Sequence, residues 1–211
     1  NISLSDAPSH IIGDAFQAII GPTIRGNKGQ FFTPKSLVKC MIKIIDPKDG
    51  EIIMDPACGT GGFLVESYGY QYNGKQSETN SYYIGIDKDK DMSDLSMAVT
   101  EIITSGKSKV YNQNSLEILC EGCKNHDLLG TIDVILTNPP FGSKIGVTDK
   151  TILEKYEFGH AWTFSEKDNT WYKMSNTVKS QDPQVLFIEL CINLLKDGGR
   201  MAIVLPEGVF G

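Results

Sequence analysis

The feature of this chain that most restricts its fold is the alternation of short apolar runs with stretches of helical periodicity. Each apolar run is short enough to be a buried strand. We expect strands at residues 51–55, 82–87, 109–111, 132–137 and 200–206. Apolar residues at helical spacing lie at residues 34–45, 61–70, 89–104 and 183–195. This order predicts a mostly parallel sheet with helices on both faces, which is a three-layer α/β sandwich.

The start of the chain precedes this pattern. Residues 5–20 have helical spacing and are followed by a Gly-rich, basic connector, so we assign residues 1–28 to an N-terminal helical segment and linker. Residues 29–211 then form the α/β domain. At its first helix, Thr33 predicts the N-cap and Pro34 the first helical position.

Composition limits the class of protein. With 211 residues, 40% of them hydrophobic, the chain can form one globular domain with a sizeable core. No apolar run approaches the roughly 20 residues that span a bilayer, and no basic-then-apolar signal pattern opens the chain. Five cysteines at irregular positions do not suggest a disulfide framework, so we expect a cytoplasmic location. A protein that binds nucleic acid unaided is usually basic, whereas this chain has a formal net charge of -6.

A Gly-rich stretch, DPACGTGGFL (55–64), joins the first expected strand to its helix. Gly59 and Gly61 permit a tight turn and the close approach of a ligand to the helix N-terminus. The stretch departs from the dinucleotide fingerprint, because Leu64 stands where the third glycine belongs, and no Gly-Lys-Ser/Thr follows. The carboxylate of Asp55 would repel a pyrophosphate but pair with an ammonium. The stretch therefore favours a ligand with an amino-acid group over a dinucleotide, and the remaining alternative is a Gly-rich turn without a ligand.

Two further polar positions follow the next strands. Asp87 ends the run 82–87, where an acidic side chain can accept both hydroxyls of a ribose. A helix cap is the alternative role, with Asp89 nearby. Asn114 and Ser115 follow the third expected strand, in a position to reach an adenine ring. An Asx turn explains Asn114 equally well.

The sequence TNPPFGS (137–143) follows the most apolar strand. An amine on an aromatic ring is a poor nucleophile, and two acceptors aimed at its hydrogens favour a more tetrahedral nitrogen. The side-chain oxygen of Asn138 and the carbonyl of Pro139 are suitable acceptors, held in place by Pro139 and Pro140. Phe141 can stack on a base. The alternative is a turn that only ends the strand, but its position downstream of the Gly-rich stretch favours catalysis by positioning.

Together, DPACGTGGFL and NPPF resemble the S-adenosylmethionine-dependent amino-methyltransferases that act on adenine N6 in DNA. GQFFTP (29–34) resembles another cofactor-contacting motif of that family, and residues 194–211 resemble the stretch around its fifth strand. The combination is most similar to the modification subunit of type I restriction–modification systems. The resemblance covers most of the chain and implies a class I methyltransferase (Rossmann-like) fold.

The resemblance also assigns roles to individual residues. It implies that Asp87 binds the ribose of S-adenosylmethionine, that Asn114 and Ser115 face its adenine, and that no metal is needed. The family often has Asp at the position of Asn114, and Asn keeps an acceptor oxygen. The residues that would line the methionine part are Phe32, Thr33, Asp55, Ala57, Gly59 and Gly61, and the target site would be Asn138, Pro139, Pro140 and Phe141.

The implied partners are duplex DNA with a flipped adenine, a specificity subunit, a nuclease subunit in some assemblies, and a second copy of the chain; no membrane is implied. The acidic net charge fits a subunit that relies on a partner for specific DNA binding. Family members carry two more strands after the fifth and a helical N-terminal domain. We therefore interpret the chain as a fragment without the C-terminal strands, and we expect an exposed sheet edge.

Two other functions compete with this one. The first is methylation of an RNA base or of a protein glutamine, but such relatives more often carry Tyr where Phe141 stands. The second is a cofactor-binding scaffold subunit without activity, which the intact NPPF set disfavours.

Two further groups of residues could in principle form functional sites, but the sequence does not assign a role to either. Cys120, Cys123 and His126 have a spacing seen in metal sites, but without a fourth ligand we expect a polar loop. Segment 142–182 is polar, has no clear periodicity and is long for a connection, so we expect a functional loop. Its aromatic residues are interpreted equally well as a nucleic-acid stacking surface or as a small core of the loop; they are Tyr156, Trp162, Trp171 and Tyr172.

Overall fold

The computed structural model of the chain describes residues 33–72, 79–142 and 146–209. The expected N-terminal helix at 5–20, the segment 1–28 and Phe32 lie outside these residues. Five strands form a parallel sheet in the order β3-β2-β1-β4-β7. Their bounds are β1 (Ile52–Asp55), β2 (Tyr82–Asp87), β3 (Ser108–Asn112), β4 (Ile132–Thr137) and β7 (Leu195–Ile203). β3 and β7 are the two edges, and β1 is central.

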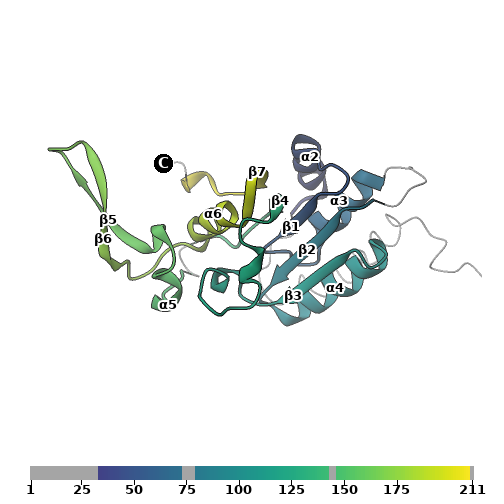
Figure 1. Cartoon of the computed structure of the whole chain (residues 1–211), viewed down its shortest axis with the longest axis horizontal. Coiled ribbons are helices and arrows are strands. Elements are labelled where there is room, and N and C mark those ends of the chain that lie inside the picture. The colour runs from purple at the N-terminus through teal and green to yellow at the C-terminus, as the bar shows by residue number, and fades with distance from the viewer. Residues whose placement is uncertain (1–32, 73–78, 143–145, 210–211) are drawn as a thin grey trace, which may run out of the picture.

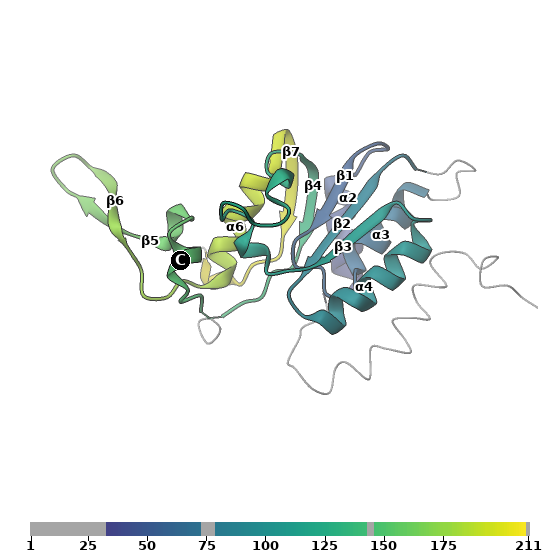
Figure 2. The same cartoon turned by 60° about the horizontal axis from the view of Figure 1, so that its bottom comes forward.

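Helices cover both faces of this sheet. One face carries α2 (Lys35–Ile45), α3 (Gly62–Tyr72) and α4 (Lys90–Ile103). The other carries α6 (Pro183–Leu194), with the short α5 (Lys150–Leu153) packed beside it. Figures 1 and 2 show the sheet between the two helical layers. The predicted three-layer α/β fold with a parallel sheet is confirmed.

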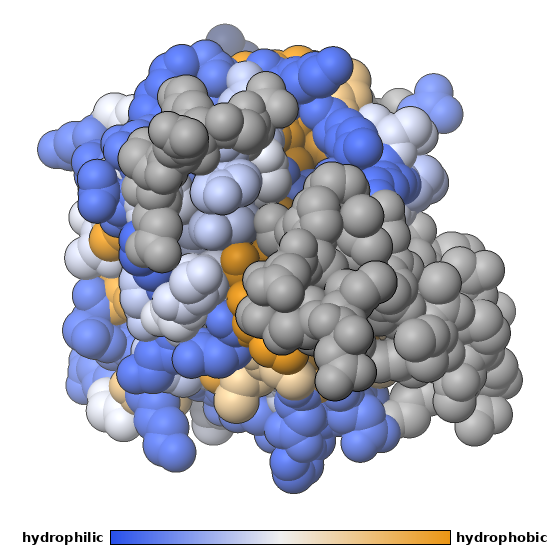
Figure 3. Space-filling view, turned by 90° about the vertical axis from the view of Figure 1, so that its right-hand side faces the viewer, coloured by the Kyte–Doolittle hydropathy of each residue, from blue (hydrophilic) through white to orange (hydrophobic). Residues whose placement is uncertain are grey.

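The strand residues divide alternately between two apolar cores. Ile53 and Val134 pack with α2, α3 and α4, whereas their neighbours Met54 and Ile135 pack with α6. This is the period of two that a strand imposes on its side chains. Every residue of β4 is buried, which explains why its sequence reads as a continuous apolar run. The outer surface is largely hydrophilic at the end seen in Figure 3, where apolar residues show only in small patches.

Several helix and strand boundaries differ by one or more residues from the prediction, and the starts of α2 and β7 are two of them. α2 begins at Lys35, and its N-cap is Pro34, which has no side-chain cap. The prediction of Thr33 as N-cap was therefore wrong by one residue, and the Thr33 hydroxyl is engaged elsewhere. β7 begins at Leu195, earlier than expected, and follows α6 without a break. Its first residue, Leu195, pairs with Ile132, and the register shifts before Arg200 pairs with Val134.

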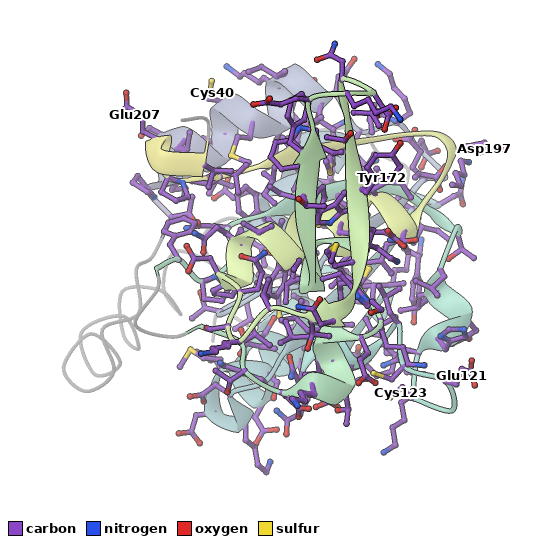
Figure 4. All side chains as sticks on the ribbon, turned by 90° about the vertical axis from the view of Figure 1, so that its left-hand side faces the viewer. Cys40, Glu121, Cys123, Tyr172, Asp197 and Glu207 are labelled. Carbon is purple, nitrogen blue, oxygen red and sulfur yellow. The ribbon has the colours of Figure 1, made fainter. Side chains whose placement is uncertain are left out.

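Segment 142–182 is not the irregular loop that we expected. It contains α5 and an antiparallel hairpin of β5 (His160–Ser165) and β6 (Thr170–Thr177), which projects away from the sheet in Figure 1. The hairpin gave no alternating pattern because both of its faces are largely exposed. Of the four aromatic residues, Tyr156 belongs to the core under α6. Trp162, Trp171 and Tyr172 are exposed, and Tyr172 is labelled in Figure 4.

The side chain of Arg200 fastens the C-terminus of α2 to the sheet. Its Nε donates to the carbonyl of Ile45 at 2.8 Å, and Nη2 donates to the carbonyl of Asp46 at 2.9 Å. The same guanidinium forms a bidentate ion pair with Glu51, at 2.7 and 2.9 Å. The ion pair lowers the pKa of Glu51, because Arg200 stabilises its carboxylate. One residue of β7 thus holds the end of α2 and the residue before β1.

We predict that Arg200→Met lowers the free energy of unfolding by about 2 to 3 kcal/mol, because it leaves Glu51 and two helix carbonyls without their charged donor. The control is Lys90→Met, which removes an exposed ion pair with Asp94 and is expected to change stability very little, because solvent screens that pair. Urea denaturation measures both. Equal losses in the two variants would contradict a structural role for Arg200.

Candidate functional site

The Gly-rich loop between β1 and α3 lies at the carboxyl end of the sheet and is tied to β2. The Cys58 amide donates to the carbonyl of Ile86 at 2.9 Å, and the Gly59 amide donates to Oδ2 of Asp87 at 2.9 Å. Gly59 has φ 51° and Gly61 has φ 81°, conformations that side chains rarely adopt. The glycines therefore allow the loop to turn tightly against β2.

Asp55, at the end of β1, is a fully buried carboxyl group. Its Oδ1 accepts hydrogen bonds from the Thr137 hydroxyl at 2.7 Å and from the Ala57 amide at 3.0 Å. Burial raises its pKa to about 7, although both hydrogen bonds favour the charged form. Among the described residues, no Lys or Arg forms a salt bridge with it. A buried carboxyl group of this kind suits a cationic ligand.

Asp87 and its neighbour Asp89 have separate roles. Asp87 accepts from the amides of Gly59 and Asp89, and burial raises its pKa. Asp89 is the residue that caps α4, accepting from the amides of Asp91 and Met92. The cap that was an alternative role for Asp87 therefore belongs to Asp89, and Asp87 stands against the Gly-rich loop.

Asn114 and Ser115 also contact different groups. The Asn114 side chain accepts from the Leu116 amide at 3.3 Å, at the start of a short 3-10 helix. This is the Asx-turn arrangement that the sequence left open. The buried Ser115 hydroxyl instead donates to the carbonyl of Pro56 at 2.5 Å, inside the Gly-rich loop. Ser115 thus joins the loop to the segment after β3.

Asn138 directly follows β4, and its side-chain amide contacts the segment before α2. Its Nδ2 donates to the Thr33 hydroxyl at 2.9 Å, and Thr33 comes from the segment before α2. Its Oδ1 is buried and has no hydrogen-bond partner among the described residues. Buried polar atoms are nearly always paired, so an acceptor of this kind is a candidate contact for a ligand or a water molecule. Pro139 is buried, and Pro140 and Phe141 are half-buried.

The structure thus brings Thr33, Asp55, Asp87 and Asn138 to the carboxyl ends of the central strands, together with the Gly-rich loop. Sequence reasoning missed two residues that organise this region. Thr137 is the last residue of β4, and its hydroxyl joins Asp55 to the segment that begins at Asn138. Gln184, buried in the first turn of α6, accepts from the Gly142 amide at 3.3 Å. The only sequence signal for Thr137 was a polar residue at the carboxyl end of the strand, directly before Asn138, and Gln184 had no such signal.

Other candidate groups in the described part of the chain form no site. No three of its His, Cys, Asp and Glu side chains are arranged to hold a metal. The His126 ring contacts the carbonyl of Ile118, and Glu121 and Cys123 lie on a peripheral loop (Figure 4). None of the described helices is long and apolar enough to cross a membrane.

Comparisons with curated proteins identify relatives along nearly the whole chain. The methylase subunit of the type I restriction enzyme EcoEI from Escherichia coli is 30% identical, and the match covers 98% of this chain and 39% of that protein. The MjaVIII methylase subunit from Methanocaldococcus jannaschii is 28% identical, over 82% of this chain and 31% of that protein. The chain therefore spans about two fifths or less of the length of these relatives.

Solved structures show the same fold. A type I restriction-modification methyltransferase subunit from Streptococcus thermophilus superposes with a TM-score of 0.70 at 21% identity, over 99% of this chain and 41% of that one. A Listeria monocytogenes protein assigned to the class I S-adenosylmethionine-dependent methyltransferases gives 0.72 at 20% identity, over 100% and 58%. The predicted class I fold is confirmed by these likenesses.

The family model described as N-6 DNA Methylase matches residues 7–211, which is nearly all of the chain. The resemblance read from the Gly-rich stretch and from NPPF therefore holds for the chain as a whole. The chain belongs to the N-6 DNA methylase family.

Proposed function

We propose that this chain carries the catalytic site of an adenine-specific DNA methyltransferase, which transfers a methyl group from S-adenosylmethionine to adenine N6. The observation that carries the proposal is the amide of Asn138. Its Nδ2 is held by Thr33, and its buried Oδ1 lacks a partner among the described residues. An amine with two hydrogens supplies the donor that this acceptor requires.

The target side of the site acts by hydrogen bonding and position. Asn138 Oδ1 accepts one hydrogen of the target amine, and the Pro139 carbonyl accepts the other. This pairing favours a tetrahedral nitrogen whose lone pair points out of the base plane. Pro139 and Pro140 restrict the backbone, and Phe141 stacks on the extruded base. The residues need no strong base, because the arrangement of amine and donor provides most of the effect.

The residues after β1 and β2 fit the proposed cofactor. Asp55 is a buried carboxyl group without a described cation, which suits the ammonium of the methionine part. Asp87 is placed by the Gly59 amide and suits the ribose hydroxyls. Gly59 has open space where a Cβ would lie and permits close approach of a ligand to the loop, whereas Gly61 is packed against Ser96 of α4. When bound, S-adenosylmethionine supplies an electrophilic methyl group.

We further propose that the chain acts as part of a modification subunit in a type I complex with a specificity subunit and DNA. Its relatives are methylase subunits of type I restriction enzymes, and the chain matches only part of their length. The formal net charge of -6 supports this division, since specific DNA affinity then comes from a basic partner.

The first prediction tests the target site. Asn138→Ala in the assembled enzyme should lower the rate of adenine methylation by about 100-fold or more, because it removes an acceptor used in the transition state. Cofactor affinity should change little. The control is Asn193→Ala, since Asn193 is exposed on α6 and its amide donates to the carbonyl of Glu189. Methyl transfer to duplex DNA at an unchanged rate in Asn138→Ala would refute the proposed function.

The second prediction follows from the raised pKa of Asp55. Below about pH 7 the free protein holds a proton there, and a bound ammonium favours the carboxylate, so cofactor binding should release protons. Calorimetry near pH 6 in two buffers of different ionisation enthalpy measures this release. It should diminish toward pH 8, where Asp55 is already ionised. Asp55→Asn should abolish most of it, and equal release in that variant would contradict the assignment.

The third prediction concerns the tight turn of the Gly-rich loop. A Cβ on Gly61 would lie 2.7 Å from Ser96 Oγ, at φ 81°. Gly61→Ala should therefore lower the free energy of unfolding by about 2 to 4 kcal/mol, from strain and overpacking together. Gly50→Ala is the matched control, because Gly50 has φ 85° and open space around it. It should lose only about 1 to 2 kcal/mol. Equal losses in a denaturant titration would contradict the close contact.

A further inference from the structure

The hydrogen bond between Asn138 and Thr33 joins two parts of the chain that are 105 residues apart. Thr33 immediately precedes Pro34, whose carbonyl accepts from the amides of Leu37 and Val38 in the first turn of α2. Because Thr33 does not cap the helix, its hydroxyl is available to the amide of Asn138. The contact places a side chain of the α2 segment directly against the target loop.

This contact bears on which end of the amide faces the target. The terminal torsion of Asn has two nearly equivalent orientations, which exchange the oxygen and the nitrogen. With Oδ1 toward the target amine, the pair is complementary. With Nδ2 toward it, donor hydrogens face donor hydrogens, and the amine loses an acceptor. A hydroxyl can accept from Nδ2 or donate to Oδ1; in the structure the Thr33 hydroxyl accepts from Nδ2, which leaves Oδ1 as the end of the amide without a partner among the described residues.

The packing of α2 restricts where Thr33 can lie. α2 packs on the sheet through Val38, Met41 and Ile42, and Arg200 holds its other end by two carbonyls. A rigid support is what a positioning contact needs, since an outer partner fixes a reacting group only if it is fixed too.

We propose that Thr33 is a positioning residue of the target site, which keeps the Asn138 amide turned with Oδ1 toward the substrate amine. This role differs from the cofactor contact that the sequence motif implies for Thr33. It rests on the proposed function, because Thr33 can have this role only if Asn138 accepts a substrate amine. It predicts that the Thr33 hydroxyl affects the methyl-transfer step more than the binding of either substrate.

The test compares Thr33→Val, Thr33→Ser and Asn138→Ala in the assembled enzyme. Single-turnover transfer of labelled methyl to duplex DNA gives the rate of the step, and calorimetry gives the cofactor Kd. Thr33→Val should lower the rate about 10-fold to 100-fold, the usual range for an outer partner of a functional side chain, with the Kd and the KM for DNA within about twofold. Thr33→Ser keeps the hydroxyl and should stay within about threefold of the wild-type rate.

The outcomes separate this inference from the proposed function. Full activity in Asn138→Ala refutes the proposed function, and the role of Thr33 with it. Loss in Asn138→Ala with full activity in Thr33→Val overturns only the inference. So does a Thr33→Val loss that is explained by weaker cofactor binding, or a Thr33→Ser variant as slow as Thr33→Val. If circular dichroism shows Thr33→Val unfolded, Thr33→Ala removes the same hydroxyl without a branched side chain and is held to the same limits.

Discussion

The buried hydrogen bond from Thr137 to Asp55 is the interaction on which the rest of the site depends. It joins the last residues of β4 and β1, which are neighbours in the middle of the sheet. Asp55 begins the Gly-rich loop, and Thr137 directly precedes Asn138. One contact therefore fixes the distance between the two halves of the site, one on each strand. Because both strands are buried in the sheet, neither half can shift without disturbing the core.

The half of the site proposed to receive the target needs a third element, because the strand ends alone do not fix a side-chain amide. α2 provides it through Thr33, and Arg200 on β7 fixes the opposite end of α2. Side-chain hydrogen bonds thus connect β7, α2 and the end of β4. α6 adds a contact through Gln184, which holds Gly142 just beyond the target motif. The two ends of the segment that carries the β5–β6 hairpin also lie side by side, because Val147 pairs with Gln181.

Much of the fold was predictable because its determinants are local and periodic. The parallel strands bury both faces and read as apolar runs, and loops such as 55–64 require glycine for steric reasons. The contact between Thr33 and Asn138 was not predictable, because local sequence says nothing about which hydroxyl meets which amide across 105 residues. The hairpin escaped for a different reason. A strand pair with two exposed faces has no buried side to impose alternation on its sequence.

The site separates groups that titrate from groups that do not. Asp55 and Asp87, with raised pKa values, lie on the side proposed for the cofactor, whereas the side proposed for the target presents an amide, two prolines and the aromatic ring of Phe141. A change of pH near neutrality therefore acts on the proposed cofactor side. The amide of Asn138 keeps its acceptor at every such pH, and its only variable is its orientation. The proposed control of that orientation by Thr33 complements a proposed target site that has no titrating base.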